Sequence, residues 1–343
     1  MLRIRGRSVE TGDEIDLVAD GDRWRADVLA GGELIEGWIL PGLVDAHTHP
    51  GHEHPSHGLS EDLLRADLAR HADAGVTLIR APGLAGEAPE WFGRDPDLPR
   101  AVHAGRWLAR EGAFFDGGGR RVDLTELPQV AAAQAAVSGW AKLIGDWPGT
   151  EPLPLDVVTD VVQAVHAVGG RVAMHCQDPE SCRVAVSSGV DTVEHGQHLA
   201  PELIDEMRRR STVWTPTLSV ILGGVESLRS GESSPRRQAY IKGALAMPAT
   251  VAAAVEAGVP LLAGTDSRPH GRIVDEVLEL VAAGVPARTA IGAASWTARS
   301  YLGLPGLVED APADAVVYAV DPMADPAALA HPTAVILRGR RVR

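Results

Sequence analysis

The sequence predicts an α/β protein in which a (β/α)8 TIM barrel carries a small β-sandwich domain formed by the N- and C-terminal segments. The central region, residues 43–304, contains eight short apolar strands, and amphipathic or Ala-rich helices lie between most of them. A barrel of this kind takes about 250 residues. No Gly-x-Gly-x-x-Gly turn follows an early strand, which disfavours a doubly wound dinucleotide-binding sheet.

The two ends of the chain differ from the centre in their pattern of apolar and polar residues. Residues 2–5 and 14–18 alternate apolar with polar side chains, and residues 34–40 lead into the central region. An alternating pattern returns at 315–320 and 334–339. Strands at opposite ends pair most simply with one another. We therefore expect one small β-domain from residues 1–42 and 305–343, with the barrel, residues 43–304, inserted between them.

Each barrel element follows from apolar periodicity and from its end signals. The predicted strands cover residues 43–49, 76–81, 101–108, 140–145, 171–176, 192–195, 213–218 and 260–265. The predicted helices cover residues 60–74, 127–138, 155–168, 179–188, 201–210, 248–257 and 272–283. Ser60 is a typical N-cap, and glycines stop several of the helices. The Gly- and Ser-rich loops 111–121 and 223–237 are candidates for mobile segments over a site.

Composition narrows the class of protein. The chain has 343 residues, of which 45% are hydrophobic, and a formal net charge of −14. The acidic balance argues against nucleic acid and anionic membrane surfaces as partners. The partner that we expect is a small-molecule substrate. No apolar run reaches the roughly 20 residues of a membrane helix, so we expect a cytoplasmic protein. Two cysteines exclude a disulfide framework. A homo-oligomer stays open, because nothing in the sequence reports on assembly.

The first barrel strand ends in a pair of histidines. In Leu43-Val44-Asp45-Ala46-His47-Thr48-His49, alternate residues point the same way, so His47 and His49 project from one face. Two imidazoles aimed at one point suit Zn²⁺ or a similar ion. Alone, such a pair is more often a surface pair or a hydrogen-bonded pair.

Four further strand ends carry polar side chains. Lys142 lies inside the apolar strand 140–145, two strands end at His175 and His195, and the last ends at Asp266. Singly, each has an ordinary structural explanation, such as a hydrogen-bonded rim histidine or a helix N-cap. In a barrel, however, the carboxyl ends of all strands meet at one face. The combination therefore predicts a metal site.

These segments resemble the ligand set of the amidohydrolase superfamily in order and in strand placement. Glu194-His195-Gly196 and Gly264-Thr265-Asp266-Ser267 are similar to its imidazolonepropionase-related and Xaa-Pro (Xaa-Arg) dipeptidase-like branch. The resemblance implies that His47, His49 and Asp266 hold the more buried of two divalent ions. It further implies that His175 and His195 hold the second ion, with carboxylated Lys142 as the bridge. Zn²⁺ is the first candidate, and Mn²⁺, Fe²⁺ or Co²⁺ can use the same ligands.

The other histidines have no role that the sequence decides. His198 and His270 are candidates for contacts with the substrate or with the metal ligands. His52, His54 and His57 crowd the loop after the first strand, where a solvated loop is the simpler explanation, and His103 lies near another strand end. The loop after His175 departs from the branch, and we expect Cys176 to be a small buried hydrophobe.

The sequence thus predicts an enzyme that hydrolyses a C–N bond in an amide, a peptide-like substrate or a cyclic amide. Water activated by a binuclear metal centre would attack the substrate, with Asp266 as the general base and acid. One alternative is a mononuclear deaminase or imidazolonepropionase-like hydrolase in which Lys142 stays an amine. Another is a barrel that binds a ligand without catalysis. The substrate is not readable, although Phe114 and Phe115 beside a Gly-rich turn suggest a partly apolar wall.

Overall fold

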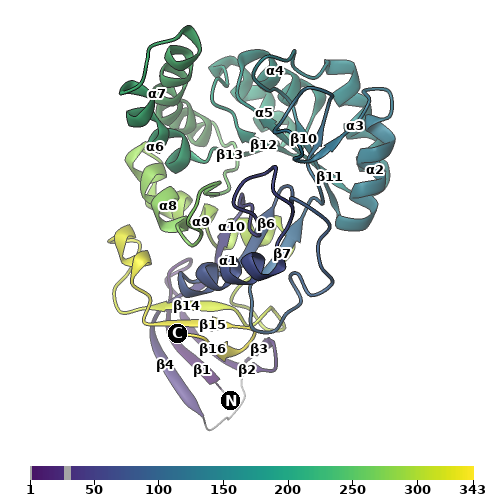
Figure 1. Ribbon diagram of the computed structural model, residues 1–343. Helices are drawn as coiled ribbons and strands as arrows, with labels where there is room; N and C mark the ends of the chain where they lie inside the picture. The colour runs from purple at the N-terminus through teal and green to yellow at the C-terminus, as the bar shows by residue number, and fades with distance from the viewer. Residues whose placement is uncertain (1, 27–31) are drawn as a thin grey trace.

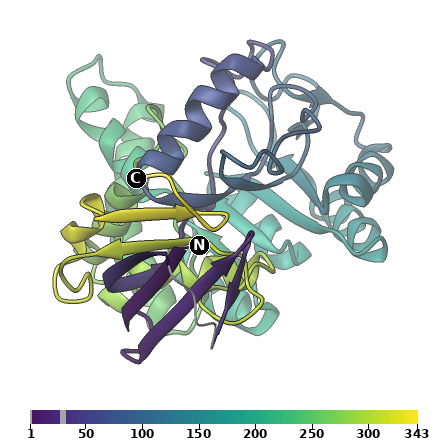
Figure 2. The same cartoon turned by 90° about the horizontal axis from the view of Figure 1, so that it is seen from below.

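Both ends of the chain contribute to one β-sheet. The computed structural model describes residues 2–26 and 32–343. Seven strands lie side by side in the order β16-β15-β14-β4-β1-β2-β3. Their bounds are β1 Leu2–Ser8, β2 Glu14–Asp20, β3 Arg23–Arg25, β4 Glu33–Pro41, β14 Ala315–Tyr318, β15 Ala334–Leu337 and β16 Arg340–Arg341. Figures 1 and 2 show the first and last segments, purple and yellow, next to each other at one end of the molecule.

This sheet differs from the predicted β-sandwich. β4 pairs in parallel with β1 on one side and antiparallel with β14 on the other, so the described strands continue one sheet across both chain ends. Ile4, Trp24, Ile39, Val317 and Ile336 pack together in a core of their own. Residues 1 and 27–31 of the predicted domain lie outside the described residues.

Parallel strands form the central region. β5 Leu43–Asp45, β6 Val76–Ala81 and β7 Arg100–His103 form one sheet in that order. The second sheet has the order β13-β12-β11-β10-β8-β9. Its strands are β8 Leu108–Ala109, β9 Arg120–Arg121, β10 Trp140–Ile144, β11 Arg171–Cys176, β12 Thr192–His195 and β13 Val213–Thr215. The predicted strand 101–108 is therefore divided between β7 and β8.

The predicted last strand, 260–265, is extended chain with one β-bridge, from Leu261 to Trp214. Its backbone is nevertheless tied on both sides. The N–H of Leu262 donates to the carbonyl of Trp214 (2.9 Å), and the N–H of Ala46 donates to the carbonyl of Ala263 (2.8 Å). The segment therefore lies between β13 and the chain that follows β5.

The helices begin and end close to the predicted bounds over most of the chain. Their bounds are α1 Glu61–Asp73, α2 Leu127–Ser138, α3 Leu155–Ala167, α4 Pro179–Ser188, α5 Ile204–Arg210, α6 Leu218–Arg229, α7 Pro235–Glu256, α8 Ile273–Ala282, α9 Ala287–Ala293 and α10 Trp296–Tyr301, with short 3₁₀ turns η1 Pro201–Leu203 and η2 Pro326–Ala330. Ser60 caps α1 by accepting a hydrogen bond from the N–H of Leu63 (3.3 Å). Gly139 and Gly189 end α2 and α4 in the left-handed conformation.

Residues 213–257 differ from prediction. β13 stops at Thr215, the predicted loop 223–237 is helical at both ends, and the predicted helix 248–257 is the second half of α7. Ser234 starts α7 because its hydroxyl accepts a hydrogen bond from the N–H of Arg237 (3.3 Å), with Pro235 at the first helical position. Pro248, which suggests a helix start in the sequence, lies inside α7. The α6–α7 pair stands at the upper left of Figure 1.

No helix in the described part of the chain is both long enough and apolar enough to cross a membrane. A continuous core of aliphatic side chains packs the helices against the parallel strands. The polar residues gather where these strands end.

Candidate metal centre

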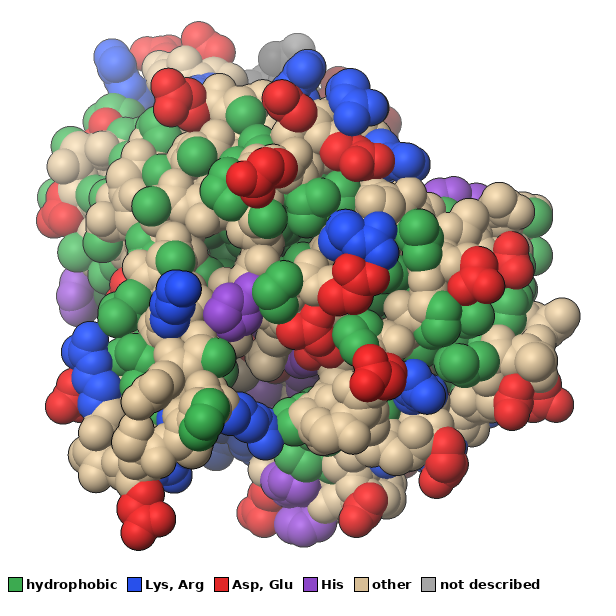
Figure 3. Space-filling model, turned by 90° about the horizontal axis from the view of Figure 1, so that it is seen from above, with side chains coloured by type: hydrophobic (Ala, Val, Ile, Leu, Met, Phe, Trp, Pro, Cys, Tyr) green, Lys and Arg blue, Asp and Glu red, His purple; other side chains and the backbone are tan. Residues whose placement is uncertain are grey.

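One cavity of about 370 Å³ is lined by every predicted metal ligand. His47 and His49 follow β5, Lys142 lies in β10, His175 and His195 lie at the ends of β11 and β12, and Asp266 follows the extended segment 260–265. In Figure 3, histidine side chains are recessed between surface side chains near the middle of the face seen from above. The strand-end argument therefore places these six side chains together correctly, although their role as ligands stays a prediction.

The imidazoles of His47 and His49 turn unprotonated nitrogens toward each other. Nδ1 of His49 donates to the carbonyl of Gly83 (2.8 Å), and Nδ1 of His47 faces a carboxylate oxygen of Glu194 (2.6 Å). Both protons are therefore on Nδ1, and the two Nε2 atoms meet at 3.1 Å. Burial lowers the pKa of His47 to about 3 and that of His49 well below its usual value. Two lone pairs thus converge where a cation would relieve their repulsion.

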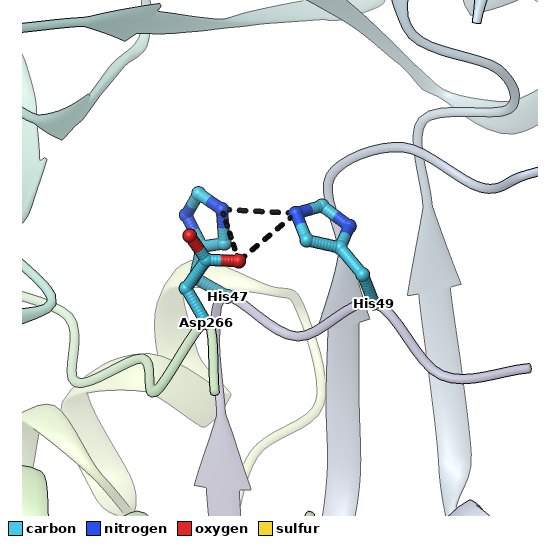
Figure 4. A group of neighbouring side chains, drawn as sticks. All are labelled: His47, His49 and Asp266. Carbon is cyan, nitrogen blue, oxygen red and sulfur yellow. Dashed lines mark hydrogen bonds and ion pairs between the residues drawn. The ribbon is translucent and has the colours of Figure 1, made fainter. Parts of the chain in front are cut away.

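Asp266 completes this group. Its Oδ1 lies 3.8 Å from Nε2 of His47 and 3.5 Å from Nε2 of His49, and Figure 4 shows the three side chains pointing at one another. The residue has a φ of 46°, and its N–H donates to the carbonyl of His47 (2.7 Å). Such a left-handed non-glycine conformation is strained and marks functional sites. Desolvation raises the pKa of Asp266 to about 7, against the opposing charge of Lys142.

Glu194 contacts Nδ1 of His47, on the side of the ring away from the cavity, and the sequence does not predict this contact. Its carboxylate accepts hydrogen bonds from Arg80 (2.8 and 2.9 Å) as well as facing His47, and both Glu194 and Arg80 are buried. Burial alone raises the pKa of Glu194, but Arg80, His47 and Lys142 outweigh it and keep the pKa well below the usual value. A carboxylate behind a histidine fixes its tautomer and raises the basicity of its other nitrogen.

Lys142 points its amine into the cavity without a partner. The side chain is 1% exposed, and its Nζ makes no hydrogen bond with the residues that the structure describes. Burial lowers the pKa of Lys142 to about 8, although the nearby Glu194 carboxylate opposes this shift. A buried amine without partners costs free energy, so this position has a role other than stability.

His175 and His195 form a second group beside the first. Their ring centroids lie 4.7 Å apart, and that of His195 lies 4.8 Å from that of His47. Nδ1 of His195 pairs with the hydroxyl of Thr217 (2.9 Å), which leaves Nε2 facing Asp266 at 3.9 Å. His195 and Thr217 both have positive φ values, 66° and 52°. Burial lowers the pKa of His175 to about 3 and that of His195 well below its usual value.

His270 lies under the His47–His49 segment, in a buried polar chain. Its Nε2 faces Asp67 (3.3 Å), and its Nδ1 pairs with the hydroxyl of Thr48 (3.0 Å), which also meets Nε2 of His71 (3.2 Å). If His270 donates to Asp67, Thr48 donates to His270 and accepts from His71. Thr48 lies between His47 and His49, so this chain of hydrogen bonds fixes the backbone that carries the two histidines.

The remaining histidines are dispersed. His198 is half-buried against α7, where a Cβ on Gly243 would meet its ring at 2.5 Å, and it is not among the cavity-lining residues. His54 and His57 are exposed, as a solvated loop predicts, but His52 is buried against Trp107. His103 lines a different pocket. Cys176 is buried and free, as predicted.

Two aromatic and two polar side chains of the cavity have no assigned role in the sequence prediction. These are Trp107, Trp147, Gln177 and Arg236. Trp107 lies near the end of the predicted strand 101–108, and Trp147 lies two residues after the predicted strand 140–145, so their place in the chain gives a weak signal for the same face of the barrel. No sequence signal indicates Arg236, because the sequence predicts a loop at residues 223–237, whereas α7 begins at Pro235.

Comparison with known proteins places this arrangement in a family. Residues 38–342 match the model of the amidohydrolase family. A full-length relative is an uncharacterized protein of Mycobacterium tuberculosis, 38% identical over 357 aligned positions, which cover 99% of this chain and 95% of that protein.

Solved structures have the same fold over the whole chain. A Xaa-Pro dipeptidase with bound methionine superposes with a TM-score of 0.83 at 22% identity, covering 100% of this chain and 99% of that one. Ochratoxinase of A. niger gives 0.84 at 18% identity, with 100% and 95% covered. The chain thus has a TIM-barrel fold with an additional domain, as in the Xaa-Pro dipeptidase-like branch. It belongs to the amidohydrolase family and is a hydrolase that acts on carbon–nitrogen bonds.

Proposed function

We propose that this hydrolase is metal-dependent and cleaves the C–N bond of an amide, a peptide-like substrate or a cyclic amide. The observation that carries the proposal is the 3.1 Å approach of the two Nε2 atoms of His47 and His49, each without a proton, beside the Asp266 carboxylate. Zn–N bonds are ~2.1 Å long, so one ion can contact both nitrogens. His47, His49 and Asp266 would hold this ion.

The second ion would be held by His175 and His195, with Lys142 between the two groups. An amine is a poor neighbour for dications, whereas its carbamate offers two anionic oxygens. The lowered pKa of Lys142, about 8, favours this change because only the neutral amine adds CO₂. The lack of a hydrogen-bond partner for Nζ supports the same assignment, because a carboxylated Nζ would be held by its carbamate oxygens on the two ions.

A bound pair of divalent ions lowers the pKa of water and polarises the substrate carbonyl. The chain's own residues would move the protons. Asp266 would take a proton from the attacking water and release it to the leaving amine. Glu194 would keep the proton of His47 on Nδ1, and Thr217 would orient His195. The strained backbone at His195 and Asp266 supports this assignment, since it aims both side chains into the cavity.

Turnover with controlled metal content tests this function. The full chain is assayed on amides, lactams, lactones and N-acyl amino acids as purified, after chelation, and after re-addition of Zn²⁺, Mn²⁺, Fe²⁺ or Co²⁺. We expect hydrolysis of C–N substrates that chelation abolishes and a divalent ion restores. Activity that survives complete metal removal would refute the metal dependence. Failure to turn over any substrate in the metal-loaded state would favour a barrel that only binds ligands.

A further inference from the structure

Four aromatic rings form a continuous wall of the cavity. This aromatic arc consists of Trp107, Phe114, Phe115 and Trp147. Ring centroids are 5.1 Å apart between Trp107 and Phe114, 5.1 Å between Phe114 and Phe115, and 4.8 Å between Phe115 and Trp147. The whole chain has only three Phe and eight Trp. Two of each lie in this wall, where Trp107 and Phe114 belong to an apolar cluster and Phe115 and Trp147 pack against it.

The arc reaches the candidate metal ligands at both ends. The ring centroid of Trp107 lies 5.0 Å from that of His49, and the centroid of Trp147 lies 6.2 Å from that of His175. A group held against the arc is therefore next to both groups of ligands. This position suits the part of a substrate that is attached to the reacting carbonyl.

The loop that carries the arc is tightly held. Phe114 has a φ of 69°, which is rare for a bulky side chain and marks local strain. Arg121 donates to the carbonyls of Phe115 (2.8 Å) and Gly118 (2.7 Å), and Arg106 donates to that of Gly119 (2.6 Å). These bonds fix the two phenylalanines in place. The Gly-rich loop 111–121, a candidate mobile segment in the sequence, is therefore held by side-chain hydrogen bonds and forms one wall of the cavity.

Only half of the arc is needed for packing. Trp107 and Phe114 are buried, at 2% and 9% exposure, and they support the other two rings from behind. Phe115 and Trp147 remain partly exposed and line the open side. Partly exposed aromatic faces in a concave site are typical contacts for an apolar ligand group.

Arg236 is the second basic side chain that lines the cavity, besides Lys142. Arg236, in the first turn of α7, lines the cavity and is exposed, and its guanidinium makes no hydrogen bond or ion pair with the described residues. Asp266 is the one carboxylate among the described lining residues. If Asp266 is used by the metal and the proton transfer, Arg236 is left to bind an anionic group of a ligand.

Arg236 and the aromatic arc would contact different halves of an amide substrate, the amine half and the acyl half. Tyr240 lies about one helical turn along α7 from Arg236. The side chain of Gln197 donates to the carbonyl of Tyr240 (2.8 Å), and Nε2 of His195, two residues before Gln197, lies 3.9 Å from Asp266, so α7 lies on the Asp266 side of the cavity. Asp266 would protonate the leaving amine. The amine half therefore extends toward Arg236, and the acyl half extends toward the aromatic arc.

We infer that the cavity selects N-aroyl or aryl-acyl amino acids, whose ring packs on Phe115 and Trp147 and whose carboxylate pairs with Arg236. This inference rests on the proposed function for the position of the scissile bond. The ring recognition itself depends only on the arc.

Calorimetric binding to the metal-loaded full chain tests the inference without turnover. N-benzoylglycine, N-acetylglycine and N-benzoylglycinamide are compared under conditions that suppress hydrolysis. We expect N-benzoylglycine to bind about tenfold more tightly than N-acetylglycine, a difference of about 1.4 kcal/mol, because its ring packs on two aromatic faces. It should also bind several-fold more tightly than its amide. Equal affinity of the benzoyl and acetyl compounds would overturn the inference, and this comparison needs no variant.

Variants then assign the contacts. Trp147→Leu and Phe115→Leu should each weaken N-benzoylglycine several-fold and leave N-acetylglycine within twofold. Arg236→Gln should remove the preference for the carboxylate over the amide. Trp91→Leu is the matched control, because Trp91 packs against Arg65 outside this cavity and should change neither ratio. An unchanged benzoyl preference in both arc variants would contradict the assignment.

The failure of this inference and that of the proposed function give different results. Tight binding of N-benzoylglycine without hydrolysis of any amide would support the aromatic site and contradict C–N hydrolysis by this centre. Metal-dependent hydrolysis with equal kcat/KM for benzoyl and acetyl substrates would support the function and overturn the inference.

Discussion

A carboxylate oxygen of Glu194 lies 2.6 Å from Nδ1 of His47, and both side chains are almost completely buried. Arg80 binds the same carboxylate from the other side. The three residues come from the chain after β5, from β6 and from β12, so the orientation of one imidazole depends on three separate parts of the fold. This arrangement keeps His47 neutral and directs its unprotonated Nε2 into the cavity.

Replacing Glu194 with Gln tests this arrangement. The neutral amide keeps the shape of the side chain but removes the charge that fixes the proton of His47. We expect metal affinity to fall about 10- to 100-fold, as for other partners of ligating histidines. Competition with a chelator measures the affinity. Glu276→Gln is the control, because Glu276 is also buried but binds the backbone N–H groups of Leu218 and Ser219, and it should leave the affinity unchanged.

Lys142→Met separates the metal-bridging role from a structural one. The amine is buried without a partner, so an apolar side chain of similar length should leave the metal-free protein as stable or more stable. Urea unfolding of both metal-free proteins gives the comparison. A loss of more than about 2 kcal/mol would show that the amine stabilises the fold, against this account.

The buried histidine network predicts a pH dependence of stability. Burial lowers the pKa of His71 to about 3. A proton added to its Nδ1 would find no hydrogen-bond acceptor among the described residues. The unfolded chain, with a histidine pKa of about 6.5, therefore binds more protons between these pH values. Stability contributed by neutral His71 is complete above pH 6.5 and is lost as the pH falls, by at most about 1.4 kcal/mol per unit.

His71→Phe isolates this contribution at equal metal loading. At pH 8 the variant should be slightly less stable, because the contact with Thr48 is lost. As the pH falls toward 5, the wild type should lose stability faster, so that the difference shrinks or reverses. A stability difference independent of pH would contradict the neutral, buried state of His71.

Asp314 joins the β-domain to the barrel. Its buried carboxylate accepts hydrogen bonds from Arg299 (2.9 Å) and Arg100 (2.8 Å) and from the N–H of Arg338 (2.9 Å). Asp314→Ala leaves the buried Arg299 uncompensated and should lower the free energy of unfolding by about 3–5 kcal/mol. Chemical denaturation measures the loss. Asp16→Ala breaks a surface pair with Arg3 and should cost far less, so equal effects would argue against burial as the cause.

The sequence predicts the parts of this protein that depend on local periodicity and strand order. His175, His195 and Lys142 reach one cavity because parallel strands align their carboxyl ends, and that rule needs only the chain order. Ser60 and Gly189 set helix ends by their own backbone chemistry, so α1 and α4 lie where expected.

The rest depends on contacts between distant residues. The sequence predicts that the terminal segments pair, but not that β4 lies between β1 and β14 in one sheet, because nothing local in these strands indicates their order. The role of Glu194 depends on Arg80, which is 114 residues away along the chain. The extent of α7 cannot be predicted because Pro248 looks like a helix start signal, whereas α7 continues through Pro248 and packs against α6.

The metal content of the purified chain tests the central claim most directly. Elemental analysis of preparations supplemented with divalent metal and bicarbonate should give about two ions per wild-type chain. Lys142→Ala should hold at most about one. Much less than one ion in the wild type would contradict the metal centre, and an unchanged two ions in Lys142→Ala would contradict the bridge.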